Sequence, residues 1–189
     1  MIFLITSLTN WNTNPYQIHI PVNQEESVTA LLVQHTTLPY NYIEQRFMIA
    51  IALEEQTGVP FNVQVAIDII ESGVEKNKEK FNNSSWITCR CNFDDKLRKQ
   101  HETEDVCFYQ FDTSMGKTYY FKKYKNIQEN WAHKAYIISN YSWFKKDMPF
   151  DWYAERLEGS FAESVDYKEG LMRVYNSYLK DMKYDILYF

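Results

Sequence analysis

The sequence predicts an α+β fold in which N-terminal helices and a C-terminal helix pack on an antiparallel sheet, and three observations carry this prediction. The chain has 189 residues, of which 45% are hydrophobic and 24% charged, and this suits a single globular domain covering residues 1–189. Apolar residues recur at helical spacing before about residue 75 and again after about residue 150. Between about residues 86 and 125 they alternate instead, which predicts a three-stranded meander.

Two strands are expected before the first helix. Residues 1–5 form an apolar run with no preceding Lys or Arg, too short for a signal peptide, and we interpret it as a buried strand. Residues 17–22 alternate between apolar and polar side chains, which is typical of a second strand. Pro21 places that strand at the edge of a sheet, because proline has no amide to donate.

Three helices are expected to follow. The first, over residues 23–35, begins with a capping-box pattern and must end before Pro39. The second covers residues 40–57 and stops at Gly58, and because its middle is apolar on nearly every side we expect it to be the central helix. The third begins near Pro60 and carries an apolar stripe.

The expected meander consists of three extended runs, at residues 86–93, 106–111 and 117–125. The connection Ser114-Met115-Gly116 is short and contains the glycine that a hairpin turn needs. Residues 128–144 fit both a helix and a strand, and we expect a helix that gives way to an extended segment.

Two further helices and a last strand are expected at the C-terminus. Residues 151–162 and 167–182 have helical spacing. Residues 184–189 are expected to form a closing strand, which pairs either within this chain or with another chain. The sequence leaves that choice open, as it does the oligomeric state.

Charge is segregated along the chain, although the formal net charge is only −5. Residues 1–75 hold eight acids and one base, which gives −7. Residues 76–146 hold fourteen bases and eight acids, which gives +6, and residues 147–189 give −4. An acidic surface of this kind attracts basic partners and speeds their association. The alternative is that these acids only solvate helix faces.

The first functional hypothesis is a binding protein, because no catalytic motif stands out. We expect a cytoplasmic, acidic, aromatic-rich inhibitor of the toxin-immunity or phage anti-defence type, which neutralises a basic protein partner such as a nuclease. The residues expected to contact this partner are Glu54, Glu55, Glu71, Asp151, Trp152, Glu155 and Glu158.

A small hydrolytic enzyme is the alternative. The chain has four histidines, and none lies in a recognised nucleophile–base or metal-binding motif. The residues that would form a His/Glu site are His133, Glu129 and Glu155.

A second alternative is a single-stranded nucleic-acid binder. Lysines and aromatic residues interleave in residues 117–125, so on a strand they would offer rings for base stacking beside charges for phosphate. The same pattern suits core aromatics with lysines that protect an edge strand. The pI of about 5.4 is low for a protein that binds nucleic acid.

The three cysteines bear on compartment and on metal binding. An odd number of cysteines in a chain large enough to fold without bridges predicts reduced thiols and a cytoplasmic location. Cys89, Cys91, His101 and Cys107 have the residue types of a zinc site, but residues i and i+2 of a flat strand lie too far apart to share one ion. We therefore expect no metal and no cofactor. No apolar run is long enough to predict a membrane span.

Overall fold

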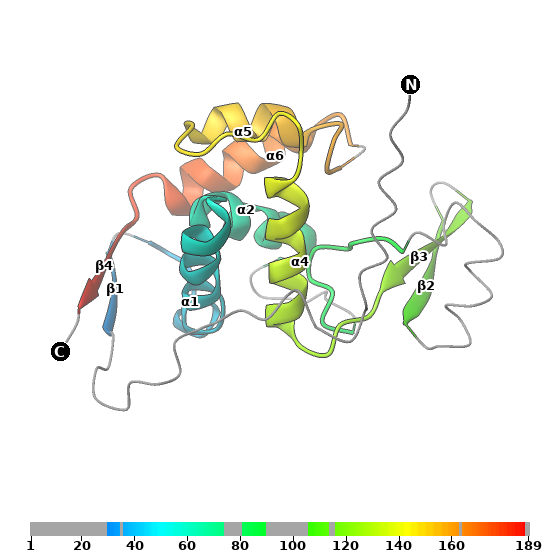
Figure 1. Ribbon diagram of the computed structural model, residues 1–189, viewed down its shortest axis with the longest axis horizontal. Coiled ribbons are helices and arrows are strands. Elements are labelled where there is room, and N and C mark those ends of the chain that lie inside the picture. The colour runs from blue at the N-terminus through cyan, green and yellow to red at the C-terminus, as the bar shows by residue number, and fades with distance from the viewer. Residues whose placement is uncertain are drawn as a thin grey trace, which may run out of the picture.

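The computed structural model describes residues 30–34, 36–73, 81–89, 106–113, 116–162 and 164–187. The strands expected at residues 1–5 and 17–22 lie outside this part of the chain. The helices are α1 (Tyr40–Thr57), α2 (Phe61–Ser72), α4 (Ile127–Ser139), α5 (Phe150–Leu157) and α6 (Tyr167–Val174), and the strands are β1 (Ala30–Gln34), β2 (Cys107–Asp112), β3 (Lys117–Lys122) and β4 (Lys183–Leu187). The helices form the body of the molecule, with the β2–β3 hairpin on one side and the β1–β4 pair on the other (Figure 1).

The corner between α1 and α2 follows from local sequence. Pro39 precedes α1 in an extended conformation, and Gly58 ends the helix at a φ of 76°, where its amide donates to the carbonyl of Glu54 at 2.7 Å. Pro60 then precedes the first residue of α2. The helices expected at residues 40–57 and after Pro60 are therefore confirmed.

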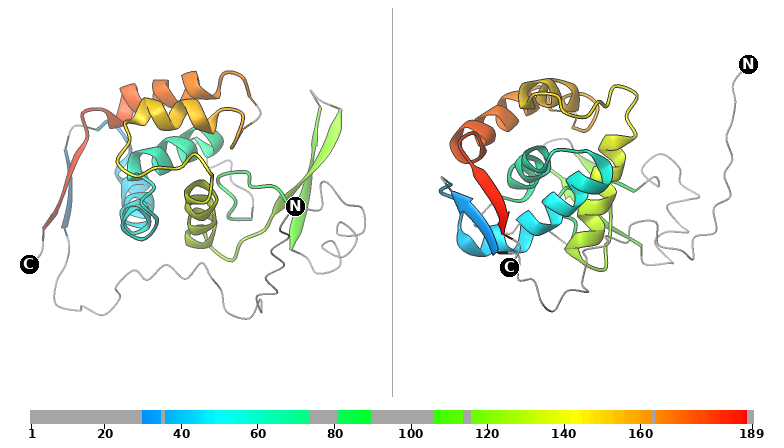
Figure 2. Two further views of the ribbon diagram at one scale, coloured as in Figure 1. Left: turned by 45° about the horizontal axis from the view of Figure 1, so that its top comes forward. Right: turned by 60° about the vertical axis from the view of Figure 1, so that its left-hand side comes forward.

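The central helix is α2, and the expectation that the preceding helix would be central is wrong. Every side chain from residue 63 to residue 69 is buried, including the polar Gln64 and Asp68. Helices α1, α4, α5 and α6 all contact α2 (Figure 2). By contrast, α1 leaves Glu55 and Gln56 exposed at its end.

The strand β1 occupies residues 30–34 of the helix expected over residues 23–35, so that prediction is wrong there; residues 23–29 lie outside the described part of the chain. β1 pairs antiparallel with β4, with Ala30 opposite Leu187 and Gln34 opposite Lys183. A short apolar run can form either structure, and here pairing with the far end of the chain decides it. The closing strand expected at the C-terminus is confirmed in β4, and it pairs within the chain.

The three-stranded meander is also wrong, because the described strands form only two-stranded sheets. β2 and β3 pair antiparallel from Cys107 opposite Lys122 to Asp112 opposite Lys117, so two of the three expected strands are confirmed. Of the third, expected at residues 86–93, the structure describes residues 86–89, and within these it is only an isolated bridge between Thr88 and Phe121. Positive φ angles at Phe81, Asn82 and Trp86 turn this segment away from an extended path.

The helices expected at residues 151–162 and 167–182 are confirmed in part: α5 ends at Leu157, where a bridge between Glu158 and Ala162 closes a turn, and the last helix ends at Leu179. Residues 128–139 lie in α4, but turns replace the extended segment that was expected after it. At the C-terminus α6 continues into a π-helical turn, Tyr175–Leu179. None of the helices in the described part of the chain has the length and apolar character needed to cross a membrane.

Candidate active site

A half-buried glutamate, largely withdrawn from water, lies near the end of the central helix. Glu71 is the last residue but one of α2, and burial raises the pKa of its carboxyl to about 7. A polar interaction with the Tyr167 hydroxyl and the positive charge of Lys134 lower this pKa, while the negative charge of Asp68 raises it further. Loss of water outweighs the other effects, so a large share of Glu71 is protonated at neutral pH.

Tyr167 faces Glu71 from the first turn of α6. The side chain is buried, at 5% exposure, and burial followed by the charge of Glu71 raises the pKa of its phenol. Helices α2 and α6 approach closely here, because Gly170 has no side chain and a Cβ at that position would lie 3.3 Å from Cδ1 of Ile70. This close approach brings the start of α6 against the end of α2.

The loop of residues 81–87 closes the other side of Glu71. The indole of Trp86 donates to the carbonyl of Glu71 at 3.0 Å, which satisfies an orphan carbonyl at the helix end. Trp86 has a φ of 49°, unusual for a bulky residue and a common sign of a constrained functional segment. A second hydrogen bond joins the end of α2 to this loop, because the Ser72 hydroxyl donates to the carbonyl of Ser84 at 2.5 Å.

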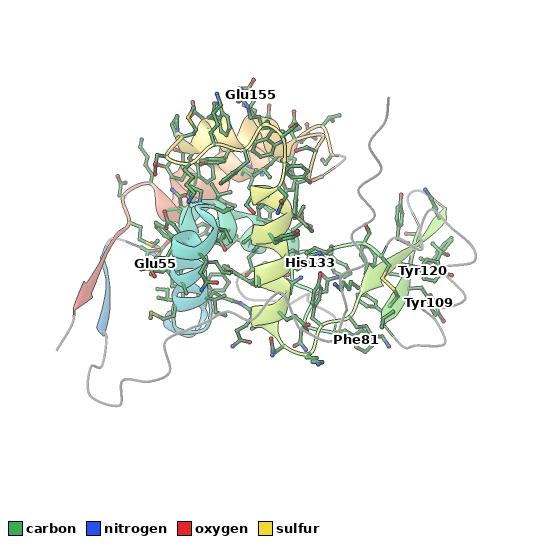
Figure 3. The ribbon with its side chains drawn as sticks, in the orientation of Figure 1. Glu55, Phe81, Tyr109, Tyr120, His133 and Glu155 are labelled. Carbon is green, nitrogen blue, oxygen red and sulfur yellow. A yellow bond between two sulfur atoms is a disulfide. The ribbon has the colours of Figure 1, made fainter. Side chains whose placement is uncertain are left out.

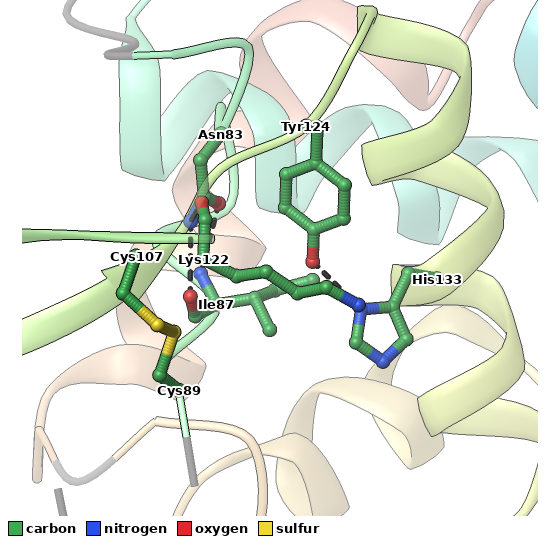
Figure 4. Close-up of a disulfide and its surroundings, with 7 residues drawn as sticks. All are labelled: Asn83, Ile87, Cys89, Cys107, Lys122, Tyr124 and His133. Atoms are coloured by element: carbon green, nitrogen blue, oxygen red, sulfur yellow. Dashed lines mark hydrogen bonds between the residues drawn. A yellow bond between two sulfur atoms is a disulfide. The ribbon is translucent and has the colours of Figure 1, made fainter. Parts of the chain in front are cut away.

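Asn83 is the centre of this loop. Its side-chain oxygen accepts the amide of Ile87 at 2.9 Å, and its side-chain nitrogen donates to the carbonyls of Ile87 and Lys122, each at 2.9 Å (Figure 4). Asn130 of α4 donates to the same Asn83 oxygen at 3.2 Å and accepts from Ser84 at 3.0 Å. Side-chain hydrogen bonds therefore fix the loop against both β3 and α4.

Aromatic rings gather on both sides of the end of α2. On the hairpin side Trp86 meets Phe121 edge to face at 5.1 Å and lies 6.4 Å from Phe108. On the helical side Tyr141 stacks on Trp143, with the ring centroids 5.1 Å apart. The phenol of Tyr141 also raises the pKa of Tyr167. Such rings provide large apolar faces near Glu71.

The His/Glu site that the sequence suggested is not assembled. His133 and Glu129 lie on α4, but Glu155 lies on α5 at the far end of the body (Figure 3). His133 makes a 2.6 Å contact through Nδ1 with the Tyr124 hydroxyl, and burial lowers its pKa to about 4. Glu129 accepts the amide of Lys125 at 2.9 Å in the first turn of α4. Both residues have structural partners rather than a shared reacting centre.

The six acids and one tryptophan expected to contact a partner are also dispersed. Glu55, Asp151 and Glu155 are exposed, whereas Glu71 is half-buried at the end of α2. Three others are half-buried and have local roles: Glu54 accepts the amide of Phe61 at 3.1 Å, Glu158 accepts the amide of Lys168 at 2.9 Å, and Trp152 lies 4.0 Å below Arg156.

Cys89 and Cys107 form a disulfide, with their Cα atoms 6.6 Å apart (Figure 4). The expectation of reduced thiols is therefore wrong, and a zinc site that uses both thiolates cannot form. Cys91 and His101 lie outside the described residues, and within those residues no group of His, Cys, Asp and Glu could hold a metal. The cytoplasmic location stays a prediction, without the reduced thiols as a reason for it.

The fold is that of a class of solved hydrolase domains. It is similar to a peptidoglycan hydrolase from Sphingomonas sp. A1 (TM-score 0.55, 20% identity, 72% of this chain and 86% of that one). It is also similar to the catalytic domain of the autolysin Auto from Listeria monocytogenes (TM-score 0.51, 17% identity, 77% and 88%). A third is a truncated glycoside hydrolase domain from Salmonella typhimurium FlgJ (TM-score 0.50, 15% identity, 76% and 98%). No protein-family model and no curated protein matches the sequence.

These comparisons correct the first functional hypothesis. The inhibitor of the toxin-immunity or anti-defence type is wrong, because the solved structures that share this fold are peptidoglycan and glycoside hydrolases. The alternative, a small hydrolytic enzyme, agrees better with them. A basic protein partner and a nucleic-acid ligand are not tested and stay predictions.

Sequence reasoning assigned Glu71 to the wrong environment and missed Tyr167 and Trp86. A signal for Glu71 was present, because residues 63–70 are apolar except for Gln64 and Asp68, and an acid at the end of such a helix lies next to the core. No local pattern marks Tyr167, which reaches Glu71 only through the packing of α6 on α2.

Proposed function

We propose that the chain is a glycoside hydrolase acting on peptidoglycan, with Glu71 as its general acid. Cleavage of a glycosidic bond requires a proton donor for the leaving oxygen, and a carboxylic acid fills this role at neutral pH when its pKa is raised. The observation that carries the proposal is the Glu71 carboxyl at the end of the central helix, whose pKa burial raises to about 7. The substrate class is supported by the peptidoglycan hydrolases that share the fold.

In this reaction the proton of Glu71 moves to the glycosidic oxygen as the bond from that oxygen to the anomeric carbon breaks. Water adds its hydroxyl to the anomeric carbon, and its remaining proton restores the Glu71 acid. Tyr167 lies beside the carboxyl, and its hydroxyl lowers the pKa that burial raises. The stacked pair of Tyr141 and Trp143 offers an aromatic face of the kind that lines ligand sites.

Asp68 is the other acid whose charge acts on Glu71 among the described residues. It is already engaged, because one of its carboxylate oxygens accepts from the Tyr42 hydroxyl at 2.7 Å and lies 3.7 Å from Nε of Arg46. We therefore assign Asp68 no bond-breaking role and name no second carboxylate.

The test is the Glu71→Gln variant, which keeps the shape of the side chain but cannot donate an acid proton. We expect its rate of clearing a peptidoglycan suspension, and of releasing new reducing ends, to fall at least about 100-fold. The native rate should also decline as pH rises through about 7, because Glu71 loses its proton there.

The matched control is Glu55→Gln, which removes an exposed acid of α1 and should keep the native rate. Far-ultraviolet circular dichroism would show that both variants are folded. A Glu71→Gln variant with native activity would contradict the assignment. A native protein that releases no reducing ends from peptidoglycan of several cross-link types would contradict the function itself.

A further inference from the structure

The β2–β3 hairpin has two different faces. In an antiparallel pair, alternate residues of one strand share a face with their direct partners on the other strand. The inner face carries the buried Phe108 and its partner Phe121, and both rings contact Trp86 of the loop beside Glu71. These contacts hold the hairpin against the candidate site.

The outer face, which we define as Tyr109, Phe111, Thr118 and Tyr120, holds three aromatic rings. Tyr109 is 72% exposed and Phe111 is 58% exposed. They are two residues apart on β2, so strand geometry places them on the same side about 7 Å from each other. Tyr120 lies opposite Tyr109 on β3, with the ring centroids 6.4 Å apart (Figure 3). A patch of neighbouring exposed rings is typical of a surface that contacts a ligand.

The outer face is joined to the structure around the candidate acid. The carbonyl of Tyr120 accepts the amide of Cys89 at 2.9 Å, and its side chain packs against the disulfide. Cys89 belongs to the same loop segment as Trp86, whose indole donates to the Glu71 carbonyl. A ligand on the outer face would therefore be held at a fixed place beside the candidate site.

The hairpin also carries an excess of positive charge. Residues 106–125 contain four lysines and one aspartate, in a chain whose net charge is −5. Lys117 is exposed at the start of β3, and its ammonium lies 5.1 Å from the centroid of the Tyr119 ring. Lys125 is exposed just beyond the other end of this strand. Rings and ammonium groups thus occur together on the hairpin, which favours a ligand that has both apolar faces and negative charges.

We propose that the outer face of the hairpin binds a polymeric glycan that bears carboxylates, at a second site beside the one that contains Glu71. The C–H bonds on one side of a pyranose ring form an apolar face that packs on an aromatic ring, and the outer face offers three such rings. The ligand chosen rests on the proposed function, because peptidoglycan is a sugar polymer whose peptide stems carry carboxyl groups. A strand held on this face keeps further glycosidic bonds at a high local concentration near Glu71.

Charge density separates this ligand from a nucleic acid. A single nucleic-acid strand carries one phosphate per nucleotide, whereas the whole chain is negative, with a pI of about 5.4. A glycan with carboxylates on its side groups carries fewer charges for its length, so the local charge of the hairpin suffices to attract it. The observations therefore favour the glycan, and an oligonucleotide is the competing ligand in the test.

The experiment measures binding without cleavage. The Glu71→Gln protein, as parent, is mixed with insoluble purified peptidoglycan, the suspension is sedimented, and the protein left in solution is quantified. Adding Tyr109→Ser and Phe111→Ser to the parent should weaken binding at least about tenfold, because two exposed rings are lost. The matched control Tyr136→Ser removes a ring of α4 that is 53% exposed and should leave binding unchanged. Far-ultraviolet circular dichroism would verify that each variant is folded.

A second pair of variants tests the charge. Lys117→Gln should weaken binding of the parent to peptidoglycan at low salt, and the difference should disappear at high salt, where charges are screened. Lys180→Gln removes an exposed lysine outside the hairpin and should bind as the parent does.

Three results would overturn the proposal. The first is equal binding of peptidoglycan by the parent and its ring variant, or no binding by the parent. The second is an oligonucleotide that displaces the parent from peptidoglycan and that the ring variant no longer binds, which would assign the outer face to nucleic acid. The third is a parent that dimerises in sedimentation equilibrium while the ring variant stays monomeric, which would assign this face to a second copy of the chain.

Activity separates this inference from the proposed function. If the parent binds peptidoglycan through the rings but the native chain cleaves none, the binding surface stands and the hydrolase proposal fails. If the native chain cleaves peptidoglycan and the ring variant binds it as the parent does, the hydrolase proposal stands and this inference fails.

Discussion

The two sides of Glu71 are held by different interactions. On the helical side α4 and α6 enclose it with buried side chains, including the charged Lys134 and the phenol of Tyr167. On the other side stands the hairpin region, which we define as residues 81–89 with β2 and β3. It is held by the Asn83 hydrogen bonds, ring contacts and a disulfide, and its rings include Tyr109 at 72% exposure (Figure 3).

This difference suggests that the helical side sets the proton affinity of Glu71 and that the hairpin region accommodates the ligand. A dry, close-packed helical side strengthens electrostatic interactions and so can adjust the proton affinity of a carboxyl. A hairpin with exposed rings and few buried contacts opens more easily than the core and can adapt to a bulky ligand. The predictions below ask whether the two sides are in fact separate.

The largest expected effect is the pH dependence of stability on the helical side. The pKa of Glu71 is about 7 in the folded chain against 4.5 for a free carboxyl, so folding favours the neutral acid. The resulting contribution of Glu71 to the free energy of unfolding is complete below pH 4.5 and is lost as pH rises through 7. The free energy of unfolding falls by about 3 kcal/mol over this range. Glu71→Gln stays neutral, so its free energy of unfolding minus the native value should grow between pH 4.5 and 7 and then level off.

Urea unfolding of both proteins at a series of pH values measures this difference. His133 acts in the opposite direction, since burial lowers its pKa to about 4 and its contribution is lost as pH falls. Because both proteins contain His133, its effect cancels when they are compared. A difference that does not change with pH would mean that Glu71 titrates like an exposed carboxyl.

A second effect should be confined to the hairpin region. The disulfide joins Cys89 and Cys107, which are 18 residues apart in the sequence. A cross-link of that span restricts the unfolded hairpin, so its removal should lower the free energy of unfolding the hairpin by about 3 kcal/mol. In the Cys89→Ser/Cys107→Ser variant, hydrogen exchange should speed up for the amides of β2 and β3. The amides of α2 and α4 should keep their native rates.

Exchange of the helical amides is therefore the internal control. If they speed up as much as the hairpin amides, the chain unfolds as one cooperative unit and the separation of the two sides is wrong. If the hairpin amides do not change, the Asn83 hydrogen bonds and ring contacts hold the hairpin without the disulfide.

The sequence predicted the elements whose limits are marked locally. Pro39, Gly58 and Pro60 place the ends of α1 and the start of α2 by their backbone constraints alone. The hairpin strands were predictable for a similar reason, since alternation and a glycine-bearing turn are local signals.

Elements that depend on distant partners were not predictable. β1 is a strand because β4 pairs with it from the other end of the chain, and no pattern near Ala30 records that. In the same way, Glu71 resembles the other N-terminal acids in sequence, and only the packing of α4 and α6 around α2 sets it apart. The candidate site was hidden because burial, rather than residue type, makes it.

The smallest expected effect compares two glutamates directly. Glu155 was considered both for a His/Glu site and for partner binding, and it is exposed, with an oxygen 3.9 Å from the ammonium of Lys168. Both side chains are open to water, so Glu155→Gln should change the free energy of unfolding by less than about 0.5 kcal/mol and leave peptidoglycan cleavage unchanged. The same substitution at Glu71 should affect both strongly. A marked loss of activity in Glu155→Gln would place part of the site on α5, and position relative to the core would then no longer explain which acid reacts.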